Sequence, residues 1–333
     1  MAGLTDLPPL VFARRCRWQF ILLFLAVARP TFSQAQETPT PTIHVDVNRV
    51  NVGAIVTNSS GRFVEGLQKS DFHVFDNGTE QPITEFLAND DPAQVVLMLE
   101  CGPSMVLFGK ESIQKADALI TSLAPADRVA VVCYSSGATV QFELSADQSA
   151  SRLALRELNF HIGSGDLNLT QSLLAVFAWL STVPGKKTVV LISSGVDSSP
   201  PEITSQFQTN ISASDVRVLT VSTSKELKKP PKKHKRSSQE KESRAQMDAI
   251  LKNGDSLLRN LATATGGRSY FPKGPKEYEK TYAEIAQIVR HEYNLSFAPQ
   301  SLDGKLHTLR VTANNGHRVD HRQAYLAPTV GSN

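Results

Sequence analysis

Cysteine is scarce in this chain, and its scarcity excludes several kinds of site. Only Cys16, Cys101 and Cys133 occur among 333 residues, with no Cys-x-x-Cys pair. A disulfide framework and a zinc cluster of cysteines and histidines are therefore excluded. Cys101 and Cys133 fall on predicted strands or at their ends, so we expect two small buried side chains. One bridge between them is the alternative, because spacing alone does not fix the required geometry.

Sequence signatures of catalysis are also missing. There is no His-Glu-x-x-His motif, no phosphate-binding P-loop and no Gly-x-Ser-x-Gly turn. His317 and His321 stand on a predicted strand at a spacing of about 13 Å, too far apart to share one zinc ion. We therefore expect a protein that is not an enzyme and has no catalytic residues. A site assembled from distant residues is the remaining alternative, which a broad hydrolase screen would test.

The long apolar runs of a membrane protein are absent. One apolar run, residues 20–28, follows Arg14, Arg15 and Arg17 and is too short to span a bilayer. Ser33-Gln34-Ala35 has the pattern of a signal-peptidase site. We therefore predict a signal peptide over residues 1–35 and an exported protein, whether periplasmic, on the outer surface or secreted. An uncleaved anchor is the alternative, and after cleavage we expect no membrane insertion.

Excess charge is missing once the predicted signal is removed. Lys plus Arg falls from 35 to 31 and Asp plus Glu from 32 to 31, so the mature chain is near neutral. No global field for nucleic acid or a membrane surface remains. The segment 225–236 holds seven Lys or Arg against one Glu, without aromatic residues. We predict a disordered, solvated loop over 225–240, with contact to an anionic surface as the alternative.

Three hydropathy patterns follow one another along the mature chain. After an extended linker, 36–42, residues 43–90 alternate between apolar and polar side chains, as β-strands do. Residues 91–290 consist of short apolar runs separated by helical segments, which is typical of βαβ units. Alternation returns over 291–333, and we expect these strands to pair with 43–90. The predicted fold is α/β: a doubly wound, mostly parallel sheet flanked by helices, with a small β-sandwich-like layer from the two end segments.

The predicted elements of the α/β unit are as follows. Strands are expected over 95–99, 129–134, 139–144, 188–193, 216–221 and 268–271, and helices over 106–123, 147–158, 170–182, 201–212, 244–265 and 276–290.

Several separate segments resemble one known family. Residues 123–132 and 187–197 resemble two strand passages of von Willebrand factor type A domains. The mature chain is similar to exported bacterial proteins with a VWFA-related domain, common in Acidobacteria, over about residues 43 to 327. The matching segments outside the α/β unit are 66–72, 75–78, 261–268 and 293–297. The resemblance implies a Rossmann-like α/β fold and a role in protein binding.

The same resemblance implies a metal-ion-dependent adhesion site, which this chain carries in degenerate form. The family's site uses an Asp-x-Ser-x-Ser turn, a Thr from a second loop and an Asp from a third. In this chain Glu100 takes the place of the Asp of that turn. Gly102 takes the place of the first Ser and has no hydroxyl, and Ser104 matches the second Ser. Asp166 falls where the Thr belongs and Ser194 where the second Asp belongs.

The candidate metal ligands are therefore Glu100, Ser104, Asp166 and Ser194, with Asp197 as a nearby substitute. One interpretation is a compensated site that binds Mg²⁺ or Mn²⁺ weakly. We favour the other, in which the metal is lost and no cofactor is needed, because Mg²⁺ tolerates misplaced ligands poorly.

The predicted function is an exported, non-catalytic, adhesion-type module. It would bind an unknown protein partner, and no nucleic acid, at the carboxyl edge of the sheet, where open α/β sheets place their sites. The alternative is a structural or assembly component of the envelope that uses its β layer. The sequence does not identify the partner or the oligomeric state.

Overall fold

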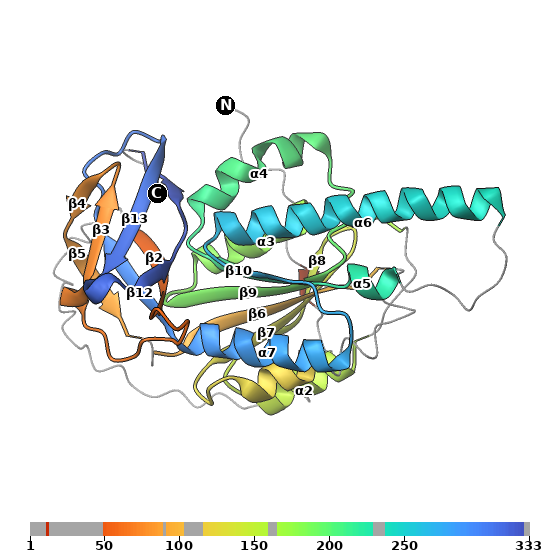
Figure 1. The fold of residues 1–333 in the computed structure, drawn as a ribbon, viewed down its shortest axis with the longest axis horizontal. Helices are drawn as coiled ribbons and strands as arrows, with labels where there is room; N and C mark the ends of the chain where they lie inside the picture. The colour runs from red at the N-terminus through yellow and green to blue at the C-terminus, as the bar shows by residue number, and fades with distance from the viewer. Residues whose placement is uncertain are drawn as a thin grey trace, which may run out of the picture.

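The computed structural model describes residues 11–12, 49–88, 91–102, 116–158, 165–228 and 237–329. An α/β unit and a layer of antiparallel sheets lie side by side (Figure 1). The expected fold class, a mostly parallel sheet flanked by helices with additional β-sheets, is confirmed.

The central sheet has the strand order β1-β8-β7-β6-β9-β10-β11. Its neighbouring strands run parallel except β7 and β8, which run antiparallel. All eight residues of β6 are buried, which explains the apolar run from Val95 to Leu99. The strands are β1 (Val11–Phe12), β6 (Ala93–Glu100), β7 (Arg128–Tyr134), β8 (Ala138–Ser145), β9 (Lys186–Ser193), β10 (Arg217–Ser222) and β11 (Ser269–Tyr270).

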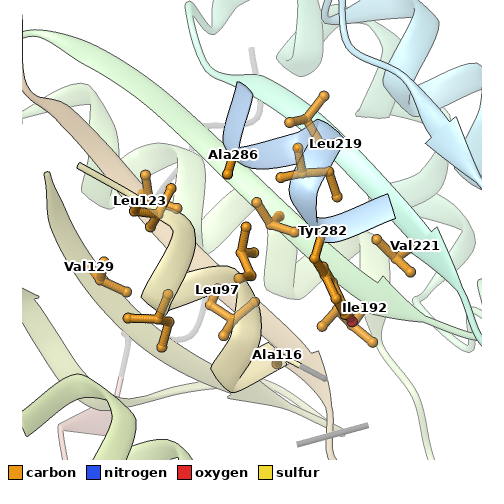
Figure 2. Close-up of a cluster of buried hydrophobic side chains, with 14 of the residues drawn as sticks. Leu97, Ala116, Leu123, Val129, Ile192, Leu219, Val221, Tyr282 and Ala286 are labelled. Carbon is orange, nitrogen blue, oxygen red and sulfur yellow. The ribbon is translucent and has the colours of Figure 1, made fainter. Parts of the chain in front are cut away.

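Helices cover both faces of this sheet (Figure 1). One core joins the sheet to α3 (Leu169–Ser181), α4 (Pro201–Ala213) and the second half of α6 (Ser238–Ala264). The other core joins it to α2 (Gln148–Arg156), α7 (Pro275–Arg290) and helical residues 116–122. Figure 2 shows this second core, where Leu97, Ile192 and Leu219 of three strands meet Tyr282 and Ala286 of α7.

The antiparallel sheets, here called the β layer, are built from both end segments of the chain. One sheet has the order β14-β2-β12-β5 and the other β15-β13-β3-β4. A shared apolar core lies between them. The strands are β2 (Val50–Thr57), β3 (Phe72–Asp76), β4 (Thr79–Gln81), β5 (Ile83–Leu87), β12 (Glu292–Phe297), β13 (Leu306–Ala313), β14 (Arg318–Asp320) and β15 (Ala324–Leu326).

A buried ion pair connects the β layer to the α/β unit. Arg217 on β10 donates its Nε–H to Glu292 Oε1 on β12 at 2.7 Å, and both side chains are 3% exposed. A second nitrogen of the same guanidinium donates to the backbone carbonyl of Gly266, just after α6. Gly53 on β2 leaves room for the carboxylate, because an added Cβ would lie 2.0 Å from Glu292 Oε1. The ion pair and this hydrogen bond therefore connect β10, β12 and the end of α6.

The structure corrects the predicted loop 225–240. Residues 224–227 form the short helix α5 (Ser224–Leu227), and α6 begins at Ser238, six residues before the predicted start. A capping box explains the early start, since Ser237 Oγ accepts from the Glu240 backbone N–H and the Glu240 carboxylate accepts from that of Ser237. Residues 229–236 lie outside the described residues, as do 13–48 with most of the predicted signal.

No helix in the described part of the chain is long and apolar enough to cross a bilayer.

Candidate functional site

The strands β6, β7, β9 and β10 end at one edge of the central sheet, which we call the carboxyl edge. It lies on the side of the α/β unit away from the β layer, near α5 (Figure 1). Glu100 is the last residue of β6 and Ser194 follows β9 directly. Because β6 and β9 are parallel neighbours, the two side chains meet at this edge.

Glu100 is enclosed at this edge by hydrogen-bond donors of the protein itself. Its side chain is buried, with 1% of the residue exposed. Glu100 Oε2 accepts from the backbone N–H and the hydroxyl of Ser194, both at 2.7 Å. The hydroxyls of Tyr134 and Ser193 lie at 3.3 and 3.4 Å from the same oxygen. The structure therefore brings Glu100 and Ser194 together and adds two residues that sequence reasoning missed.

Tyr134 is held in its neutral, donating form. Burial and the charge of Glu100 raise the pKa of its hydroxyl well above the ordinary value. The hydroxyl also lies 2.6 Å from Ser193 Oγ. The carboxylate charge of Glu100 is thus balanced by oriented dipoles, as a buried anion requires.

Leu167, rather than the predicted Asp166, faces the turn after β6. A Cβ added at Gly102 would lie 2.5 Å from Leu167 Cδ2, so the leucine side chain occupies the space beside that glycine. Leu167 is 7% exposed. Asp166 is exposed and makes no side-chain hydrogen bond or ion pair with the described part of the chain. Sequence reasoning missed Leu167 because an apolar residue in a loop does not resemble a ligand or a catalytic group.

Asp197 belongs to a separate hydrogen-bond group. Its Oδ1 accepts from the backbone N–H of Thr170 at 3.3 Å and of Ser199 at 3.0 Å, and its Oδ2 accepts from the Thr170 hydroxyl. Thr170 is in the first turn of α3, where a carboxylate is favoured by free backbone N–H groups and by the helix dipole. Asp197 therefore ties the loop after β9 to α3. Ser104, the remaining predicted ligand, lies outside the described residues.

The structure places the described members of the predicted metal set in different surroundings rather than around one point. Glu100 Oε2 and both carboxylate oxygens of Asp197 accept hydrogen bonds from protein donors, and a methyl group of Leu167 lies beside Gly102. Within the described ranges, no group of three or more His, Cys, Asp or Glu side chains is placed to bind a metal ion. An octahedral Mg²⁺ shell needs oxygen ligands free to face the ion.

The expectation of two unbridged cysteines is wrong. Cys101 and Cys133 form a disulfide with an S–S distance of 2.01 Å and a Cα–Cα distance of 5.6 Å. The backbone N–H of Cys101 donates to the carbonyl of Tyr134 at 2.7 Å, so the chain continues beside β7 after β6 has ended. The pairing of β6 with β7, which aligns Leu99 with Cys133, together with this bond brings the two cysteines within reach, and their spacing in the sequence could not reveal it.

Two glycines set the position of the loop that carries Ser194. Gly195 has φ +76° and packs directly on Gly254 in α6: an added Cβ at Gly195 would lie 2.4 Å from the Gly254 carbonyl oxygen. A Cβ at Gly254 would lie 2.6 Å from the carbonyl oxygen of Ser194. Both obstacles are backbone atoms, so a side chain here forces the loop away from α6.

We expect Gly254→Ala to lower the free energy of unfolding by about 3 kcal/mol, measured by urea denaturation, because overpacking against backbone is costly. Alanine otherwise favours a helix interior over glycine by about 1 kcal/mol. Asn253→Ala, at the exposed neighbouring position of α6, is the control and should leave stability unchanged or slightly raised. Equal losses in both variants would contradict the close packing of α6 on this loop.

Comparisons with known proteins give remote structural similarities only. The sequence matches no family profile and no curated protein. A von Willebrand factor type A protein from Catenulispora acidiphila is similar at 12% identity and TM-score 0.46, over 82% of this chain and 76% of its own. An aerotolerance-related membrane protein from Bacteroides fragilis is similar at 11% identity and TM-score 0.42, over 59% of this chain and 98% of its own. BatB from Bacteroides thetaiotaomicron is similar at 14% identity and TM-score 0.38, over 59% and 97%. The fold assignment therefore rests on the strand order and helix placement of this chain.

Proposed function

We propose that this chain is an exported, non-catalytic protein-interaction module that contacts its partner at the carboxyl edge, without a metal ion. The observation that carries the proposal is the first half of α6. Residues 238–250 are exposed apart from the half-buried Arg244, and this part of the helix extends beyond the edge (Figure 1). Met247 and Ile250 are 51% and 47% exposed. Three residues apart on a helix, they share one face.

The surroundings of Glu100 support the same proposal. Its hydrogen bonds to Ser194, the disulfide of Cys101 and the packing of Gly195 on Gly254 hold the edge loops in one arrangement. A preformed surface loses little conformational entropy when a partner binds. In this arrangement, groups of the chain itself keep the edge loops ordered, as a bound metal ion would otherwise do.

The carboxyl edge is tested by retention of partners from the cell envelope of the source organism. We expect immobilised wild-type protein to retain specific proteins and the double variant Met247→Asp/Ile250→Asp to lose them. Leu306→Asp is the matched control, because Leu306 is 57% exposed on β13 of the β layer. Loss with Leu306→Asp and retention with the α6 variant would favour the second candidate, an assembly component that binds through its β layer.

Independence from metal is tested by titration. We expect calorimetry with Mg²⁺ and with Mn²⁺ to show no saturable heat up to about 1 mM metal, because Glu100 Oε2 and both oxygens of Asp197 already accept hydrogen bonds from the protein. Partner retention in the presence of EDTA should equal that in its absence. Saturable heat together with loss of retention in EDTA would restore the metal-dependent interpretation.

A further inference from the structure

A groove of about 650 Å³ lies between α3, α4 and the β layer, at the end of the parallel sheet opposite the carboxyl edge. Leu174 and Phe177 of α3 form one apolar wall, and Leu326 and Pro328 at the end of the β layer form the other. Small-molecule sites typically have volumes of roughly 300 to 1,000 Å³ and lie where two layers meet. The groove has the size and position of a ligand site.

The charges along the groove are unevenly balanced. Arg49, Lys187 and Arg322 line it. Arg49 forms an ion pair with Glu85, and Lys187 Nζ lies 2.7 Å from Asp215 Oδ2. Arg322 forms no ion pair with any carboxylate of the described residues. Asp215, which also lines the groove, attracts Arg322 as well as Lys187, so Glu85 and Asp215 together face three cations and one positive charge is in excess.

Arg322 is also deeply placed. The residue is 7% exposed, and its guanidinium donates to the backbone carbonyls of Ser214 at 2.5 Å and Asn51 at 2.7 Å. Its Nε–H is buried without an acceptor in the described part of the chain. Burial lowers the pKa of this guanidinium to about 10. A buried cation whose hydrogen bonds go only to neutral carbonyls is costly unless an anion joins it.

We propose that this groove binds a small carboxylic acid with an apolar body. The carboxylate lies beside Arg322, and the body packs between Phe177 and Leu326. A carboxylate pairs with a guanidinium through charge-assisted hydrogen bonds, which neutral ligands cannot match. The site is separate from the carboxyl edge, so this inference does not depend on the proposed function.

Dansyl-L-phenylalanine serves as the probe, because it joins a carboxylate to an aromatic body and its emission rises on burial. Dansyl-L-phenylalaninamide, which has the same aromatic body but no carboxylate, is the control ligand. We expect the acid to bind saturably to the purified full-length protein, at least about tenfold more tightly than the amide. No saturable binding, or equal affinity for acid and amide, would overturn the proposal.

Two variants connect the binding to the groove. Ala178→Trp fills the groove from an exposed position on α3, and we expect it to abolish binding of the acid. Ala249→Trp, at an exposed position on α6, is the matched control and should bind as the wild type does. Arg322→Gln should reduce the affinity for the acid to that for the amide. Unchanged binding by Ala178→Trp would show that the probe lies elsewhere.

Discussion

Replacement of Glu292 by glutamine is expected to lower the free energy of unfolding by about 4 kcal/mol. Arg217 and Glu292 are each 3% exposed, and the change leaves the guanidinium charge buried without its counter-ion. The Arg217 side chain also donates to the Gly266 carbonyl, so the loss affects β10, β12 and the end of α6 together. This is the largest effect that we expect from a single ionic substitution.

Urea denaturation measures the loss, and the exposed pair of Arg49 and Glu85 provides the control. The side chains of that pair are 42% and 58% exposed, so Glu85→Gln should cost less than about 1 kcal/mol. The double variant Arg217→Met/Glu292→Leu should be less destabilised than Glu292→Gln, because it removes both buried charges. If the double variant lost more than Glu292→Gln, charge burial would not explain the effect.

Removal of the Cys101–Cys133 disulfide is expected to lower the free energy of unfolding by a similar amount. The bridge closes a loop with a sequence separation of 32 residues. The chain-entropy relation gives about 4 kcal/mol for a loop of this length, since the bridge restricts the unfolded chain. Denaturation of the double variant Cys101→Ser/Cys133→Ser, compared with the oxidised wild type, measures this contribution.

Reduction of the wild type with dithiothreitol provides the control for the serine substitutions. Its stability should fall to that of the double variant, because both states lack the same cross-link. A reduced wild type as stable as the oxidised protein would show that the bridge does not contribute through loop closure. If only the double variant were destabilised, the loss would come from the serine hydroxyls near β6 and β7.

The α/β unit could be predicted from the sequence because burial on both faces leaves a clear pattern. Residues 95–99 lie inside β6 and 188–193 inside β9, since a run of mainly apolar residues is typical of a strand that is covered on both faces. The start of α6 was missed by six residues. Its first half is exposed apart from Arg244, so no apolar periodicity marks it, and only the capping box of Ser237 and Glu240 does.

The candidate site was only partly predictable. The family resemblance assigned Glu100 and Ser194 to one site, and the pairing of β6 with β9 brings them together. The βαβ pattern alone does not give this pairing, because β7 and β8 lie between the two strands in the chain. The position of Leu167 depends on how a loop packs against Gly102, which depends on side-chain shape rather than on residue type. Thr170 could have been recognised as the partner of Asp197, because a carboxylate is favoured near a helix start.

The order of the strands has a consequence for biosynthesis. β2 pairs with β12, and β3 pairs with β13, so the strands of the first segment must await partners made after the whole α/β unit. While synthesis proceeds, β2, β3 and β5 have unpaired edges that could bind other chains. Long-range pairing of this kind also forms slowly. The growing chain would therefore benefit from a holdase chaperone until β12 and β13 have been made.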